Sequence, residues 1–83
     1  MTKLRQLSGR EVVKALGSFG FQLVAIRGSH AKLRRVLVGG EHQTLTVPVH
    51  RRLRPGMLHA LFRQASRYIP EADLKMWFFT DER

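Results

Sequence analysis

The sequence predicts an α+β fold in which one helix, three strands and a second helix follow one another, with both helices on one face of a three-stranded antiparallel sheet. A run of apolar residues at helical spacing comes first, three short β-prone runs with glycine-containing connections follow, and a second helical run begins at a proline. With 43% of its 83 residues hydrophobic, the chain can form one domain, with a core over about 8–70 and a C-terminal extension over 71–83.

The first helix begins at a serine cap. Ser8 and Glu11 have the spacing of a capping box, in which each side chain bonds the backbone N–H of the other residue. Apolar residues then recur at helical spacing and form one stripe: Val12, Val13, Leu16 and Phe19. Gly20 stands where a residue in the left-handed conformation ends a helix.

Three strand-like runs follow, over residues 21–26, 31–38 and 44–49. The first run is apolar at both parities, so either of its faces could be buried. Gly28 makes the turn to the second run. Pro48 cannot donate a hydrogen bond to a neighbouring strand, so the third run is expected at an edge of the sheet or ending there.

The second run alternates apolar with basic residues. Ala31 and Leu33 share one face, and Lys32 and Arg34 share the other. Arg35 breaks this alternation, which leaves room for a bulge or a twist at that position.

The second helix is expected to start at Pro55, because the first turn of a helix tolerates the missing N–H of proline. Pro70 is expected to end it. Its buried stripe consists of Leu58, Leu61, Phe62, Ala65 and Ile69.

Residues 71–79 could form a short third helix with Leu74, Trp77 and Phe78 on one face. Such an apolar surface near the end of a small domain must pack on the domain itself or on a partner. The sequence leaves both possibilities open.

The charge of the chain points to a polyanionic partner. Fifteen Lys and Arg against six Asp and Glu give a net charge of +9. The cations cluster over residues 27–35 and 51–54 rather than on one amphipathic helix, which favours nucleic acid, then an acidic protein, over a membrane surface. The chain has no cysteine, no secretory signal and no apolar run long enough to span a bilayer, so a cytoplasmic location is expected.

The turn between the first two strands carries the residues best suited to chemistry. Histidine can give or take a proton near neutral pH, and His30 begins the second strand directly after Gly28 and Ser29. Glycine lets a substrate approach the backbone closely. Lys32 is two residues along the same strand, so its side chain should share a face with that of His30.

Cations around His30 are candidates to hold a phosphate: Arg27, Lys32 and Arg34. A second basic run, Arg51, Arg52 and Arg54, leads into a helix N-terminus, which also favours a phosphate. The cations around His30 could be an ordinary solvated strand face, and spacing alone favours that interpretation over catalysis. The second run could equally be a solubilising loop.

No metal or other cofactor is expected. The four histidines are irregularly spaced, and two-metal phosphodiester chemistry needs clustered acids, which this chain does not have. A cation-rich site with few acids suits RNA cleavage by the ribose 2′-hydroxyl, for which protein groups supply proton transfer and positive charge. Two other functions stay open: a non-catalytic double-stranded-RNA-binding module and a module whose basic face docks an acidic protein.

Five motifs, in this order and spacing, resemble the HicA family of bacterial toxins over roughly residues 8–70. They are Gly-Phe at 20–21, Gly-Ser-His at 28–30, Val-Pro-Val-His at 47–50, Pro-Gly-x-Leu at 55–58 and Leu-Phe-Arg-Gln-Ala at 61–65.

The resemblance implies a double-stranded-RNA-binding-domain-like fold and a ribonuclease that cleaves mRNA without the ribosome. It implies that His30 is the catalytic histidine and that a cognate HicB antitoxin covers the active face. The hypothesis is therefore a type II toxin that acts as a metal-independent endoribonuclease. Arg27, Lys32 and Arg34 would contact phosphate, Gly28 and Ser29 would shape the turn, and Arg51, Arg52 and Arg54 would be secondary RNA contacts.

Overall fold

A computed structural model describes residues 2–81 of the chain. Its elements are β1 (Thr2–Leu4), α1 (Gly9–Gly17), β2 (Gln22–Arg27), β3 (His30–Val36), β4 (His42–Pro48), α2 (Pro55–Ala65), α3 (Glu71–Phe78) and β5 (Phe79–Asp81). The predicted helix–three strands–helix order is confirmed. The short strands β1 and β5, which form a separate antiparallel pair, were not anticipated from the sequence.

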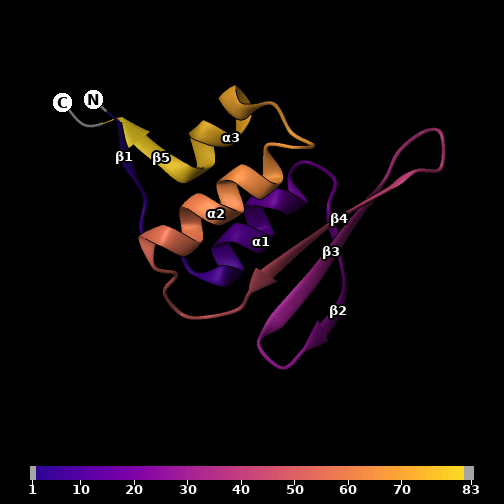
Figure 1. Ribbon diagram of the computed structural model, residues 1–83, viewed down its shortest axis with the longest axis horizontal. Helices are drawn as coiled ribbons and strands as arrows, with labels where there is room; N and C mark the ends of the chain where they lie inside the picture. The colour runs from indigo at the N-terminus through magenta and orange to yellow at the C-terminus, as the bar shows by residue number, and fades with distance from the viewer. Residues whose placement is uncertain (1, 82–83) are drawn as a thin grey trace.

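The main sheet is antiparallel with the strand order β2-β3-β4, and the helices lie on one side of it (Figure 1). Residues that point toward the helices alternate with more exposed residues along β3 and β4. Ala31 and Leu33 of β3 and Leu45 and Val47 of β4 are buried in the core. Pro48 ends β4, which is an edge strand as predicted.

Strand β2 contains a β-bulge, and all six of its residues are exposed, so neither of its apolar faces is buried. Leu23 pairs with Leu33 and Ala25 pairs with Lys32, so Val24 between them has no partner on β3. The extra residue shifts the alternation by one position, which puts Leu23 and Ile26 on the same face. The bulge suggested at Arg35 is wrong, because β3 and β4 pair there in regular register.

Helix α1 starts as the sequence predicts and packs closely against the end of β4. The capping box is formed, with Glu11 N–H donating to Ser8 Oγ at 3.1 Å and Ser8 N–H donating to Glu11 Oε1 at 2.8 Å. Gly20 ends the helical segment with φ 94°. Gly9 N–H donates to the carbonyl of His50 at 2.8 Å, which joins the start of α1 to the chain after β4.

Helix α2 starts at Pro55 as predicted but ends at Ala65, before Pro70. The expected continuation is therefore wrong: the chain makes turns over residues 66–69 instead. Pro70 has no N–H to bond the carbonyl of Ser66, and its ring would clash with that carbonyl in a continued helix, so the last turn before it is not regular. Ile69 is nevertheless buried, because Ile69 N–H bonds back to the carbonyl of Ala65 at 3.0 Å.

The C-terminal segment packs on the domain. Leu74 and Phe78 of α3 are fully buried, and the ring of Phe62 makes edge-to-face contacts with Phe78 at 5.6 Å and Phe79 at 5.3 Å between centroids. Trp77 was predicted to share the buried face of Leu74 and Phe78, and this is wrong. Its side chain is 40% exposed, because the buried stripe of α3 is narrower than predicted. No helix in the described part of the chain is long and apolar enough to cross a membrane.

Candidate active site

The turn at residues 27–30 joins β2 to β3 with two central residues. Gly28 has φ 58°, whereas Ser29 does not have a positive φ. This is the sign pattern of a type II′ turn, which requires glycine at its first central position and matches the twist of the flanking strands. The carbonyl of Ser29 accepts a hydrogen bond from Val49 N–H at 2.7 Å, so the turn is also attached to the chain after β4.

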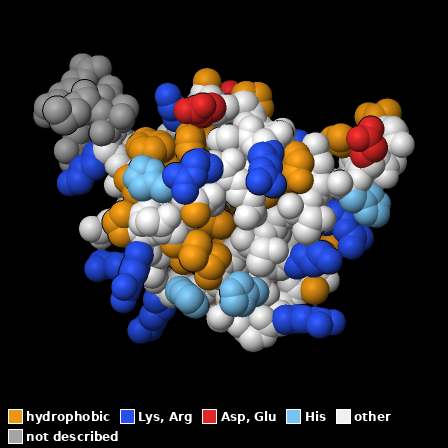
Figure 2. All heavy atoms as spheres, viewed as in Figure 1, with side chains coloured by type: hydrophobic (Ala, Val, Ile, Leu, Met, Phe, Trp, Pro, Cys, Tyr) orange, Lys and Arg blue, Asp and Glu red, His pale blue; other side chains and the backbone are white. Residues whose placement is uncertain are grey.

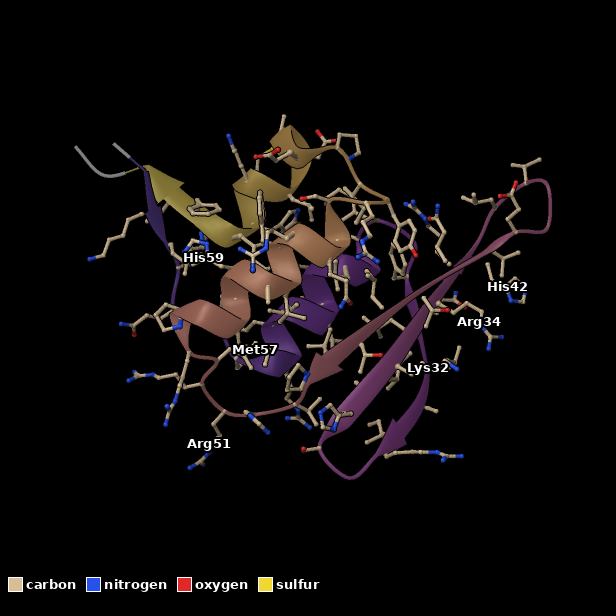
Figure 3. All side chains as sticks on the ribbon, viewed as in Figure 1. Lys32, Arg34, His42, Arg51, Met57 and His59 are labelled. Atoms are coloured by element: carbon tan, nitrogen blue, oxygen red, sulfur yellow. The ribbon has the colours of Figure 1, made fainter. Side chains whose placement is uncertain are left out.

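In an antiparallel pair, residues that lie directly opposite each other point to the same face of the sheet. The strand pairing therefore shows which side chains lie together in the site. Arg27 is opposite His30, and Ala25 and Thr46 are opposite Lys32 from the two neighbouring strands. Their side chains lie on the open face, the face of the sheet that the helices do not cover. Figure 3 shows Lys32 and Arg34 pointing to this side, away from the helices.

These side chains surround a hollow of about 460 Å³ on the open face. We call it the His30 hollow, and its lining consists of Ala25, Arg27, His30, Lys32 and Thr46. All five residues are exposed to solvent. The structure thus brings together three of the predicted site residues, which come from two different strands.

The His30 hollow carries uncompensated positive charge. No carboxylate lines it, and within residues 2–81 the side chains of Arg27, His30 and Lys32 make no hydrogen bond or ion pair. On the face shown in Figure 2, acidic side chains appear only over α3 and at the β3–β4 hairpin, while Lys and Arg side chains are spread around the surface. An incoming phosphate would therefore meet cations without having to displace partners.

Arg35 shows the opposite behaviour. Its guanidinium donates to Gln43 Oε1 at 2.6 and 2.9 Å, to the carbonyl of Phe19 at 3.0 Å and to the carbonyl of Tyr68 at 2.9 Å. It also lies 4.7 Å from the ring centre of Phe21. This arginine is a structural residue of the helix-covered face, and it is not part of the site.

The remaining predicted contacts lie outside the His30 hollow. Arg34 is on the open face, two residues beyond Lys32 along β3, opposite Thr44. Arg51 lies on the connection to α2, below the start of that helix in Figure 3. Arg52 and Arg54 border a different groove, at the start of α2.

Two residues of the His30 hollow were missed by sequence reasoning. Thr46 had a signal, since it alternates with buried apolar residues in a predicted strand and so had to lie on the polar face. No feature of the sequence pointed to Ala25, because its position opposite Lys32 depends on the bulge at Val24. In the described part of the chain, no three His, Asp or Glu side chains come together in a way that could hold a metal ion.

The geometry can supply proton transfer and charge stabilisation at one place. The exposed imidazole of His30 lies at the start of β3. The guanidinium of Arg27 is opposite it on β2, and the ammonium of Lys32 is two residues along β3. This combination suits a substrate that carries a phosphodiester.

Comparison with known proteins shows the family of the chain. A family model described as HicA toxin of bacterial toxin–antitoxin matches residues 9–66, which include the His30 hollow and all three strands of the main sheet. No curated protein and no solved structure matches the chain.

Proposed function

Because this chain belongs to the HicA toxin family of bacterial toxin–antitoxin systems, we propose that it is a metal-independent endoribonuclease that cleaves mRNA. The observation that carries the proposal is the His30 hollow, where an exposed histidine lies on the uncovered face of the sheet among cations that have no ion-pair partner within the described residues. Since mRNA is the substrate in this proposal, the enzyme acts in the cytoplasm.

In the proposed reaction the ribose 2′-hydroxyl attacks the neighbouring phosphorus. The O2′–P bond forms and the P–O5′ bond breaks, which gives a 2′,3′-cyclic phosphate and a 5′-hydroxyl. One proton leaves the 2′-oxygen and one is delivered to the departing 5′-oxygen. His30 is the proton-transfer residue at one of these oxygens, and Arg27 and Lys32 stabilise the charge on the phosphate.

The other basic residues have supporting roles in this proposal. Arg34 contacts a phosphate next to the cleaved linkage, and Gly28 and Ser29 hold His30 at the start of β3. The run after β4 adds secondary RNA contacts through Arg51, Arg52 and Arg54.

The test compares the wild-type protein with His30→Ala and with the control His42→Ala, which changes an exposed histidine at the other end of the β3–β4 pair. Each purified protein is incubated with RNA in EDTA. We expect the wild type and the control to release fragments with 5′-hydroxyl ends, and His30→Ala to be slower by about a hundredfold or more. Equal cleavage by His30→Ala would remove this residue from the mechanism.

A substrate with sulfur in place of the 5′-oxygen identifies which proton His30 moves. A thiolate leaves without protonation, so this substrate restores the rate of His30→Ala if His30 acts as the general acid. If the rate stays low, His30 acts at the 2′-hydroxyl as the general base.

An antitoxin partner follows from the family, and we propose that it is a HicB-like protein that covers the His30 hollow. An acidic surface would be attracted to a chain with net charge +9 and would exclude RNA. We expect a neighbouring reading frame to encode such a protein, and its addition to stop RNA cleavage. RNA that binds but stays intact would instead favour a binding module without catalysis.

A further inference from the structure

We infer that the His30 hollow is a subsite for one unpaired nucleotide, with Ala25 and Thr46 as its two walls. The inference rests on the proposed ribonuclease activity and deepens it, because it states which form of RNA the site accepts. Neither wall residue is needed for proton transfer. Their role is to determine which nucleotide can lie beside the cleaved linkage.

The side chains on either side of Lys32 are small. Ala25 on β2 and Thr46 on β4 are both opposite Lys32, and side chains in such pairs have Cβ atoms about 5 Å apart. A methyl group on one side and a short hydroxyl side chain on the other leave open space over the lysine stem. This space is part of the hollow of about 460 Å³.

The bulge in β2 determines which side chain lies opposite Lys32. If β2 continued in regular register from the Leu23–Leu33 pair, Val24 would be opposite Lys32. Because Val24 is instead the extra residue, Ala25 takes that place. A bulge next to a site commonly re-aims a side chain. Here it places the methyl group of Ala25, instead of the branched side chain of Val24, beside Lys32.

The polar groups of the subsite are free to bind a ligand. Thr46 N–H donates to Gln64 Oε1 at 3.3 Å, which holds the outer edge of β4 against α2. The Thr46 hydroxyl, in contrast, makes no hydrogen bond with any residue of the described chain, and it points to the open face beside Lys32. It can therefore donate to or accept from a base edge or a ribose.

An unpaired nucleotide fits these walls better than a duplex does. Bases inside an A-form duplex are stacked and present only a shallow minor groove or a deep, narrow major groove. A base can enter a hollow on a protein surface only if it is single-stranded or taken out of the stack at an energetic cost. The His30 hollow is thus expected to select loops and single-stranded stretches.

Binding is measured first, with an RNA that cannot be cleaved because fluorine replaces each 2′-hydroxyl. We expect the single strand to bind more tightly than the same sequence annealed to its complement at physiological salt. Ala25→Leu fills the hollow and should weaken single-strand binding by about tenfold. The control Ala60→Leu adds the same volume to an exposed position of α2 outside the hollow and should change nothing.

Cleavage sites are then mapped on one long RNA. Thr46→Val removes the hydroxyl but keeps a β-branched strand residue, and it should redistribute cleavage among sites by several-fold. The control Thr44→Val, two residues from Thr46 on β4 and outside the hollow, should keep the wild-type map. The inference is overturned if Ala25→Leu binds like the wild type, or if duplex and single strand bind equally. Absence of wild-type cleavage would instead defeat the proposed function, while the binding result would still decide the subsite.

Discussion

Two neighbouring arginines on β3 show how one position along a strand decides what a residue does. Arg34 lies on the open face, and its side chain makes no hydrogen bond or ion pair with the described residues. Arg35 points to the helix side and makes four hydrogen bonds, two of them to Gln43. Identical side chains are therefore exposed on the open face in one case and hydrogen-bonded within the fold in the other.

This contrast gives a prediction at the residue scale. Arg35→Met leaves two carbonyls and an amide oxygen without their donor, and should lower the free energy of unfolding by about 2–4 kcal/mol. Arg34→Met should change it by less than about 0.5 kcal/mol while weakening RNA binding. Urea denaturation and RNA titration of both variants check the prediction. The assignment is wrong if the two substitutions cost equal stability.

At the scale of elements, the contact between α1 and the end of β4 positions the site. A Cβ on Gly9 would overlap the carbonyl oxygen of Pro48 and come within 2.6 Å of Val49 Cα. Pro48 is opposite His30, and Val49 N–H donates to Ser29. The start of α1 and the turn at residues 27–30 are thus joined through the same two residues of the chain.

Gly9→Ala should therefore be costly, because backbone atoms must move apart. We expect a loss of about 2–3 kcal/mol in the free energy of unfolding. Gly17→Ala is the matched control: nothing lies within 4 Å of its new methyl group, so it should gain about 0.5–1 kcal/mol through better helix propensity. Thermal or urea unfolding measures both. A neutral Gly9→Ala would show that this contact does not constrain the fold.

At the scale of the whole molecule, the core extends beyond the part that matches the family. Leu74 and Phe78 lie after residue 66 yet belong to the same hydrophobic cluster as Leu33 and Leu58. The β1–β5 pair then joins the N-terminal strand to the C-terminal one. The extension therefore contributes to the stability of the domain that carries the site.

Phe78→Ala should lower the free energy of unfolding by about 3–5 kcal/mol, since it leaves a large cavity next to Phe62. The control on the same helix is Met76→Ala, whose side chain is 74% exposed and which should cost less than about 0.5 kcal/mol. Chemical denaturation of both variants tests the role of α3. An equally small effect of Phe78→Ala would mean that the segment only rests on the domain.

The net charge of the molecule predicts how binding responds to salt. Each phosphate that is neutralised adds about 0.7 to the negative slope of log K against log salt for single-stranded RNA. Raising the salt should weaken binding, and Arg34→Gln should make the slope shallower by about this amount. Arg67→Gln, on the turn after α2, should leave the slope unchanged. If both variants have the wild-type slope, Arg34 does not contact phosphate.

The sequence by itself determined the order of the central elements, the capping box at Ser8, the glycine turn before His30 and the shared face of His30 and Lys32. These features follow from short-range periodicity and from the conformations that single residue types allow. Only the tertiary structure decided that Arg27 and Thr46 join His30, that Ala25 is opposite Lys32 and that Phe78 is buried while Trp77 is exposed. Strand register, the bulge at Val24 and helix packing depend on contacts between distant residues, and local patterns do not encode them.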